Sequence, residues 1–366
     1  MSEFDLAVIG AGSGLEVASS AAGHGWRVAV IDEGPFGGTC LNHGCIPSKM
    51  LIHSADVMET IRGAERFGIN VTVNSVDWAA IVNRVSATID EDARRTEHAV
   101  SESQNMQVFR SRARFLSPFE LQVGDEHVAA RHVVIAAGSR PRVIKVEGIE
   151  ETPYVTSDDA MRLSEQPGSL IIVGGGAVAV ELAHFFGALG TAVTLIARGD
   201  RLLSGADREI SEAFTASAAK KFDVRVGREV VSVTRRGTAI SVTVRSPDGL
   251  ETVEAEQLLL AAGRIPNTDL LEVDRAGIAV DDRGFLKTDD FLQTSVPDVW
   301  ALGDIAGRFM LKHSANLEAL FVAHNMLHPD NRLRMNYHAM PQAIFSSPQV
   351  AGVGETEQSL RTQGRE

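Results

Sequence analysis

Residues 4–32, FDLAVIGAGSGLEVASSAAGHGWRVAVID, decide the fold of this chain. The segment begins with a short apolar stretch, residues 4–9, and continues through the glycine-rich turn GAGSG into a run rich in small residues. A second apolar stretch, residues 28–31, ends at Asp32. The order strand, glycine turn, helix, strand is the βαβ unit of a doubly wound parallel sheet. The sequence therefore predicts an α/β fold.

The glycine turn has the spacing that dinucleotide binding requires. Gly10 and Gly12 allow a tight turn and a close approach of backbone to a pyrophosphate, and Gly14 extends the turn. The third glycine of the usual fingerprint would fall at position 15, which is Leu15, so the pattern departs there. Asp32 follows Gly10 by 22 residues and stands where a carboxylate binds a ribose hydroxyl.

The same unit occurs a second time. Residues 169–173 (SLIIV) are followed by GGGAVAVE, a helical segment and the strand-like residues 192–197 (AVTLIA). Gly174 and Gly176 form the second turn, with Ala179 at the third fingerprint position. Arg198 stands where an acid is expected, and an arginine there favours the 2′-phosphate of NADPH. Two copies predict two nucleotide sites, or one site and one relic.

The remaining pattern predicts the other elements of the two units. Helical periodicity covers residues 50–64 and 76–101, and alternation over residues 225–260 predicts a β-hairpin with a Ser-Pro-Asp-Gly turn. No low-complexity linker separates the copies, so we expect interleaved domains. The predicted fold class is α/β, with two Rossmann-like doubly wound domains, the first discontinuous, and a β-meander or hairpin insertion.

Composition restricts the classes of function. Of 366 residues, 35 are Lys or Arg and 48 are Asp or Glu, giving a net charge of −13. This balance argues against nucleic-acid and anionic-membrane partners. No apolar run approaches the roughly 18 residues of a membrane span, and no signal peptide is visible. Two cysteines are too few for a secreted disulfide scaffold, so we expect a cytoplasmic protein.

Both cysteines lie in GGTCLNHGCIPSK, residues 37–49. A helix start and Lys49 would stabilise a thiolate at one of them, and four intervening residues allow the sulfurs to meet. Zinc binding is one alternative, with His43 as a third ligand, but the sequence supplies no second ligand cluster. Inert buried thiols are another. A redox-active pair beside a dinucleotide site fits the pattern better than either.

The cysteine segment resembles the active-site segment of the flavin-dependent pyridine nucleotide–disulfide oxidoreductases. The resemblance extends through residues 136–141 (AAGSRP), 261–267 (AAGRIPN) and 301–304 (ALGD). Within that family, Arg198 and three segments resemble the mycothione reductases. The segments are residues 61–69, 202–207 and 309–325. The dihydrolipoyl dehydrogenases, which are NAD-linked, are the alternative.

The resemblance implies that the chain binds FAD and NADPH, and no metal. The implied FAD residues are Gly10, Gly12, Gly14 and Asp32 at the adenosine half and Thr39 and Asp304 at the flavin side. The implied NADPH residues are Gly174, Gly176 and Arg198. Lys49, Gly138 and Gly263 are further cofactor-binding candidates.

The resemblance also implies a reaction. Hydride passes from NADPH through FAD to a Cys40–Cys45 disulfide, and then to a low-molecular-weight disulfide such as mycothione. Cys40 would be the thiol that attacks the substrate, and Cys45 the thiolate beside the flavin. Lys49 and Glu181 match family residues that pair near the reactive edge of the flavin.

The implied domains are FAD-binding over residues 1–145 and 265–330 and NAD(P)H-binding over residues 146–264. Family members end in an interface domain of about one hundred residues. It forms the homodimer and carries the catalytic base. Residues 331–366 resemble only the opening of that domain, so we expect a truncated form. Such a form could be limited to NADPH-oxidase or diaphorase activity.

Overall fold

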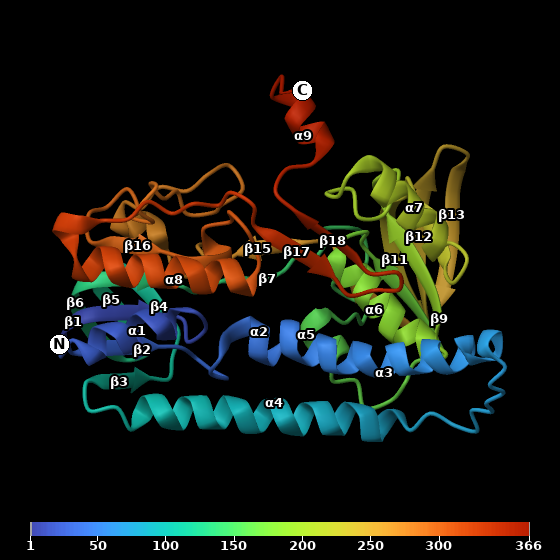
Figure 1. Cartoon of the computed structure of the whole chain (residues 1–366), viewed down its shortest axis with the longest axis horizontal. Coiled ribbons are helices and arrows are strands. Elements are labelled where there is room, and N and C mark those ends of the chain that lie inside the picture. Colours follow the sequence, from blue (N-terminus) through green and yellow to red (C-terminus); the bar gives the residue numbers. More distant parts are fainter. Residues whose placement is uncertain (1, 366) are drawn as a thin grey trace. The chain divides into compact units, whose positions relative to one another are not determined.

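The computed structural model describes residues 2–365, which form two compact units (Figure 1). Unit 1 contains residues 1–45, 88–140 and 264–337, and unit 2 contains residues 46–87, 141–263 and 338–366. The chain therefore passes from one unit to the other several times. The predicted Rossmann-like α/β fold with a discontinuous first domain is confirmed.

Unit 1 is built on a seven-stranded sheet in the order β3-β2-β1-β6-β5-β4, with β16 also paired to β6. Strands β1, β2, β3, β6 and β16 run parallel, whereas β4 and β5 continue the sheet antiparallel. The strands are β1 (Ser2–Ile9), β2 (Val28–Ile31), β3 (Met106–Phe109), β4 (Ala113–Ser117), β5 (Glu120–Val123), β6 (Glu126–Ile135) and β16 (Val299–Ala301).

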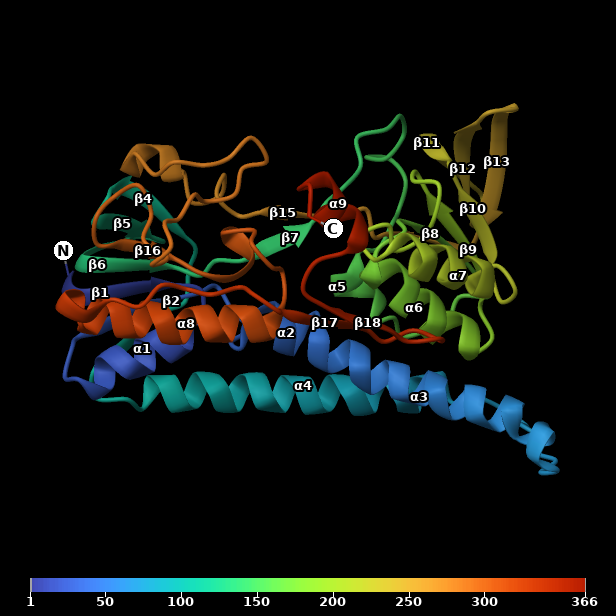
Figure 2. The same ribbon diagram turned by 45° about the horizontal axis from the view of Figure 1, so that its top comes forward.

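Helices α1 and α8 of unit 1 lie side by side (Figures 1 and 2). The helices of this unit are α1 (Gly14–Gly23), α2 (Gly38–Asn42) and α8 (Lys312–Leu327), with the 3₁₀ turns η2 (Val273–Ala276), η3 (Gly303–Ile305) and η4 (Pro329–Asn331). The short strands β7 (Ser139–Pro141) and β15 (Arg264–Pro266) pair where the chain passes between units. Helix α4 (Trp78–Ser101) has residues in both units.

Unit 2 repeats the parallel arrangement in a smaller sheet, ordered β10-β9-β8-β14, beside a three-stranded antiparallel sheet, β11-β12-β13. Its strands are β8 (Ser169–Val173), β9 (Ala192–Ala197), β10 (Asp223–Val226), β11 (Glu229–Arg236), β12 (Ala239–Ser246), β13 (Gly249–Ala255), β14 (Gln257–Leu260), β17 (Pro341–Ile344) and β18 (Val350–Val353). Its helices are α3 (Cys45–Gly63), η1 (Ala64–Phe67), α5 (Ser157–Ala160), α6 (Ala177–Ala188), α7 (Arg208–Ala218) and α9 (Glu357–Thr362).

Each unit has its own hydrophobic core. In unit 1 the core joins the strands to the segments around η2 and η3, and in unit 2 it joins the parallel sheet to the antiparallel one. The predicted hairpin is the β12–β13 part of that antiparallel sheet, and its turn is the expected one at residues 246–249. A second turn at Gly237, which has a φ of 63°, adds β11 as a third strand.

Gly14 makes the tight contact between helix and sheet. A Cβ on Gly14 would lie 2.8 Å from Val8 Cγ1 and 2.9 Å from Ala136 Cβ. Gly14 is buried and Leu15 is only partly buried. The close-packed position is therefore one residue earlier than the fingerprint predicts, and the departure at position 15 leaves the packing intact.

No helix within residues 2–365 is both long enough and apolar enough to cross a bilayer.

The contact at Gly14 predicts an asymmetric response to alanine within α1. Gly14→Ala should destabilise the chain by about 1–3 kcal/mol, because the new methyl group overpacks the interface between helix and strand. Gly23→Ala, at the other end of α1, is the control: a Cβ there meets nothing within 4 Å. It should leave stability unchanged or raise it by less than about 1 kcal/mol. Urea unfolding midpoints measure both, and equal midpoints for the two variants would contradict the packing argument.

Candidate active site

The first glycine turn, after β1, brings Asp32 to the start of α1. Asp32 accepts hydrogen bonds from the Ala11 N–H at 2.6 Å and from the Gly34 N–H at 2.7 Å. Burial raises the pKa of the Asp32 carboxyl, and the two backbone donors oppose that shift. Each carboxylate oxygen has a second lone pair, so Asp32 can also accept a bond from a ribose hydroxyl.

The loop that carries the cysteines packs directly on this turn. The Gly37 N–H donates to Ala11 O at 2.8 Å. A Cβ on Gly38, which has a φ of 65°, would lie 2.8 Å from the Gly12 Cα. Backbone therefore contacts backbone between the two segments, as the binding of a pyrophosphate between them requires. Thr39 follows Gly38 and is exposed.

The two cysteines are brought together as the sequence predicts. Cys40 lies in α2 and Cys45 begins α3; both are partly buried, and no disulfide joins them. A hydrogen bond with Cys45, followed by burial, raises the pKa of the Cys40 thiol above its usual range. The reduced pair is therefore organised to hold a proton on Cys40. No group of three or more His, Cys, Asp or Glu between residues 2 and 365 is placed to hold a metal.

Lys312 is a residue that sequence reasoning missed. Its ammonium donates to Ser13 Oγ at 2.9 Å, directly before α1 begins. Lys312 is also the first residue of α8, where a cation opposes the helix dipole. Its charge lowers the pKa of Cys40, against the larger effects that raise it. A lysine eight residues after the end of the ALGD segment, at a helix start, was the signal in the sequence.

The start of α1 fits an anion. Ser13 is the N-cap residue, and its side chain makes no capping bond to the first turn of the helix. The positive end of the helix dipole and the Lys312 ammonium therefore meet at one turn. The pyrophosphate of FAD suits this donor set.

Asp304 is held by residues from the two segments that join the units. Ser139 Oγ donates to Asp304 Oδ2 at 2.7 Å. Arg264 donates to Ser139 through Nε and Nη2, at 2.7 and 2.6 Å, and its Nε lies 3.7 Å from Asp304 Oδ2. The segments AAGSRP and AAGRIPN thus support the ALGD turn. Gly138, with a φ of 66°, has open space beside its Cα.

A buried carboxyl lies beneath the same turn. Glu318 of α8 is 1% exposed and accepts from the Gly303 N–H at 2.6 Å and from the Tyr337 hydroxyl at 2.8 Å. Burial raises the pKa of Glu318 despite these two donors. Glu318 therefore fixes the backbone next to Asp304.

In unit 2, the second glycine turn leaves the start of α6 open. A Cβ on Gly174 would lie 2.2 Å from Ala261 O, so any side chain at this position would collide with the backbone that follows β14. Gly176 is exposed and makes no side-chain cap, and a Cβ on it or on Gly263 would meet nothing within 4 Å. The free N–H groups of this helix start suit a second dinucleotide pyrophosphate.

Arg198 directly follows β9 and is exposed. The neighbouring acid, Asp200, pairs with Arg201 at 2.8 Å. The Arg201 Nε is buried and has no hydrogen-bond partner. Two arginines thus stand at the strand end where one was predicted.

Lys49 and Glu181 form the ion pair that their resemblance to the family suggests. Lys49 Nζ lies 2.7 Å from Glu181 Oε2, and the Glu181 side chain is 8% exposed. Phe345, which sequence reasoning missed, donates its backbone N–H to Glu181 Oε1 at 2.9 Å. Its ring centroid is 4.9 Å from Lys49 Nζ. Lys49 also lies one helical turn after Cys45 on α3, so both residues face the same way.

Comparisons with known proteins show the family to which the chain belongs. The family model "pyridine nucleotide-disulphide oxidoreductase" matches residues 4–319. The chain belongs to this family. It is accordingly an FAD-dependent oxidoreductase that couples a pyridine nucleotide to a disulfide.

Individual relatives show how broad the family is. The chain is 40% identical to mycothione reductase from Mycobacterium tuberculosis over 378 aligned positions, covering 100% of this chain and 80% of the relative. It is 34% identical to dihydrolipoyl dehydrogenase from Chlamydia muridarum, covering 99% and 78%. Among solved structures, the HOCl-induced flavoprotein disulfide reductase RclA from Escherichia coli, as its Cu(II) complex, has a TM-score of 0.88. Its sequence identity is 28%, with 100% of this chain and 80% of that one covered.

The position of Lys312 predicts two measurable effects of Lys312→Met. Retained FAD should dissociate more readily, because a cation is lost from the uncapped start of α1. In the reduced apoprotein at fixed alkaline pH, alkylation of Cys40 should slow about two- to tenfold, because loss of the cation raises the pKa of Cys40 further and leaves less of the reactive thiolate. Flavin release is followed by fluorescence, and Cys40 modification by peptide mass spectrometry.

Lys287→Met is the control for Lys312→Met, since Lys287 is an exposed lysine of the same unit. It removes the same charge without touching the turn. If both variants behaved alike, Lys312 would have no specific role at the site.

Proposed function

We propose that this family member is an NADPH-dependent reductase of a low-molecular-weight disulfide, most specifically mycothione. The observation that carries the proposal is the hydrogen-bonded Cys40–Cys45 pair on a loop whose backbone packs against the first glycine turn. The 40% identity to a mycothione reductase supports this choice of substrate.

The proposed overall reaction consumes NADPH, a proton and a disulfide, and releases NADP⁺ and two thiols. Bound FAD would accept hydride from NADPH and supply two electrons to the Cys40–Cys45 disulfide. Breaking that bond leaves a thiolate on Cys45 and, after uptake of a proton, a thiol on Cys40. The raised pKa of Cys40 agrees with this placement of the proton.

Reduction of the substrate would follow by thiol–disulfide exchange. Cys40 loses its proton and attacks one substrate sulfur, so that a Cys40–substrate disulfide forms and the first product thiolate leaves. The Cys45 thiolate then attacks Cys40 Sγ, which re-forms the Cys40–Cys45 bond and releases the second thiolate. The Lys312 charge favours the Cys40 thiolate and so assists the attack on the substrate.

The remaining residues are assigned by position. Gly10, Gly12, Gly14, Asp32, Thr39, Gly138 and Asp304 would hold FAD, and Gly174, Gly176, Gly263 and Arg198 would hold NADPH. The FAD-binding residues would belong to residues 1–145 and 265–330, and the NADPH-binding residues to 146–264. The Lys49–Glu181 pair would keep an ammonium fixed beside the reacting ring of the flavin.

The exposed Arg198 favours NADPH over NADH, because Asp200 is already paired with Arg201 and does not neutralise it. A dihydrolipoyl dehydrogenase, running towards NAD⁺, is the second candidate, since such enzymes are 34–35% identical to this chain. An assay of mycothione, glutathione disulfide and lipoamide with each nucleotide separates the two candidates.

Anaerobic titration of the FAD-loaded protein with NADPH tests the proposed electron path. We expect a long-wavelength charge-transfer band, because the Cys45 thiolate would form beside oxidised flavin. Cys45→Ser should remove the band and leave flavin bleaching by NADPH intact. Bleaching without any band in the unmodified protein would show that the cysteines are not coupled to the flavin.

Arg198→Glu tests the nucleotide preference. The ratio of kcat/KM for NADPH to that for NADH should fall about 10- to 100-fold, the loss expected for a charge-assisted phosphate contact. Arg235→Glu makes the same change of charge at an exposed position on β11 and should leave the ratio unchanged. An unchanged ratio for Arg198→Glu would remove this residue from the phosphate site.

A further inference from the structure

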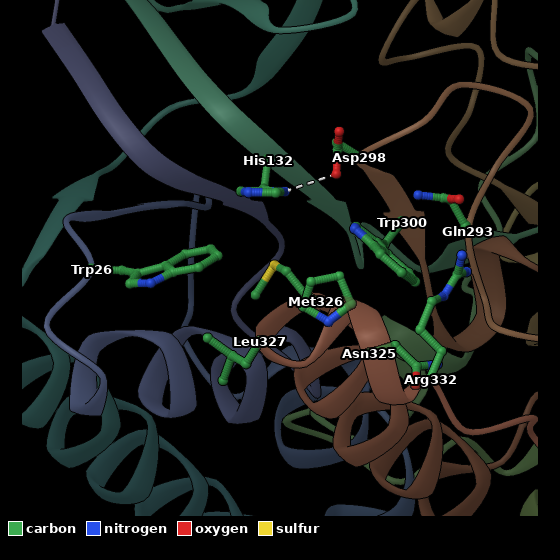
Figure 3. A pocket seen from close by; sticks show the side chains of 10 residues that line it. Trp26, His132, Gln293, Asp298, Trp300, Asn325, Met326, Leu327 and Arg332 are labelled. Carbon is green, nitrogen blue, oxygen red and sulfur yellow. Dashed lines mark ion pairs between the residues drawn. The ribbon is translucent and has the colours of Figure 1, made fainter.

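Unit 1 contains a cavity that none of the candidate cofactor or catalytic residues lines. Its volume is about 420 Å³, within the range of small-molecule sites. The lining comes from the loop before β2, from β6, from β16 and its approach, and from the end of α8 (Figure 3). The lining residues are Trp26, His132, Gln293, Asp298, Trp300, Asn325, Met326, Leu327, Pro329 and Arg332. We call this cavity the Trp26–Trp300 pocket.

Buried polar atoms without hydrogen-bond partners concentrate at this pocket. Eight such side-chain atoms occur within residues 2–365, and four of them belong to residues that line it: Trp300 Nε1, Arg332 Nε, Arg332 Nη2, and His132 Nδ1, whose contact with Asp298 Oδ1 at 3.3 Å is an ion-pair contact only. Trp300 is only 3% exposed. Leaving a buried N–H group unpaired costs about 1–3 kcal/mol. A cluster of unpaired N–H groups therefore indicates that a bound molecule accepts their hydrogen bonds.

The chemistry of these atoms defines that partner. Tryptophan and arginine nitrogens only donate hydrogen bonds, so at least three of the four atoms require an acceptor. Arg332 has an ion-pair contact with Asp289 at 3.6 Å, too long for a hydrogen bond. Its guanidinium carbon lies over two rings, 4.3 Å from the Phe291 centroid and 5.1 Å from that of Trp300. Its donors are therefore held in place by stacking.

The side chains that line the pocket favour a ligand whose acceptor group is attached to a flat, apolar ring. Trp26 stacks on His132 with ring centroids 5.0 Å apart. In Figure 3, Trp26 and Trp300 stand on opposite sides of Met326. A methionine side chain adapts readily to a ring that displaces it, because it has several rotatable bonds and a polarisable sulfur.

Charge limits the acceptor to a single negative charge. Asp298, 53% exposed, lies 3.3 Å from His132 Nδ1 at the pocket, and Asp289 already faces Arg332. Burial lowers the pKa of His132, so the imidazole is neutral near pH 7 and adds no positive charge. Arg332 already faces one acid and a second acid lies at the pocket, so a phosphate dianion would add two negative charges here and a carboxylate only one.

We infer that the Trp26–Trp300 pocket binds a small aromatic carboxylate, with the carboxylate accepting from the Trp300 indole N–H and the Arg332 guanidinium. The aromatic ring occupies the space between Trp26, Met326 and Leu327. This site is separate from the proposed reductase reaction, and binding requires no turnover.

Titration of the FAD-loaded protein with benzoate tests the inference. Two of the three tryptophans of the chain line the pocket, so binding should change the intrinsic tryptophan fluorescence. Benzoate should bind at least about tenfold more tightly than benzamide, which lacks the charge, and than cyclohexanecarboxylate, which lacks the aromatic ring. Inorganic phosphate should not bind.

Trp300→Phe keeps a ring and removes the donor, so benzoate affinity should fall about tenfold, the loss of one charge-assisted hydrogen bond. Arg332→Gln should lower it further. Arg334→Gln is the matched control: Arg334 also stacks on Phe291, at 5.3 Å, but it does not line the pocket and is paired with Asp290. The Arg334→Gln variant should bind benzoate with unchanged affinity. Circular dichroism and FAD content verify that each variant is folded.

Two results would overturn the inference. One is no saturable response to benzoate, which would mean that ordered water alone satisfies the four atoms. The other is equal benzoate affinity in the unmodified protein, Trp300→Phe and Arg332→Gln. Neither result bears on the charge-transfer band, so the reductase proposal is tested independently.

Discussion

A Cβ on Gly38 would lie 2.8 Å from the Gly12 Cα, and a Cβ on Gly10 would lie 2.3 Å from Ala136 O. These contacts allow no side chain at either position. They hold three segments, distant in sequence, against one another at the ends of the parallel strands. The thiol pair, the start of α1 and the support for Asp304 all depend on that close approach of backbone to backbone.

The two units leave corresponding helix starts without a side-chain cap and place different charged residues beside them. In unit 1 the uncapped start of α1 is joined by the Lys312 ammonium, which α8 supplies from the far end of the sequence. In unit 2 the start of α6 is also uncapped, and Arg198 and Arg201 stand at the end of β9 instead. The repeated fold thus provides the same helix start twice, and the charged residues around it distinguish the two sites.

Much of this arrangement follows from the sequence. Local motifs or the family resemblance predict the βαβ units, the cysteine loop and the pairing of Lys49 with Glu181. Four other contributors could not be predicted in this way, because their contacts join segments tens to hundreds of residues apart. They are Lys312, Ser139, Arg264 and Phe345. The role of Gly14 was misplaced by one position for a related reason. Packing depends on the distance to Val8 and Ala136, which a glycine pattern does not encode.

Two buried acids, Asp32 beside the first glycine turn and Glu318 beneath the ALGD turn, have raised pKa values because of burial. Each binds its proton more tightly in the folded chain than in the unfolded one. Their contribution to stability therefore increases as the pH falls through their folded-state pKa values, opposite to that of a salt-bridged carboxylate. When these carboxyls are ionised, burial costs the folded protein part of their hydration energy. Two carboxyls that hold backbone turns through hydrogen bonds thus lower the stability of the fold in their ionised form.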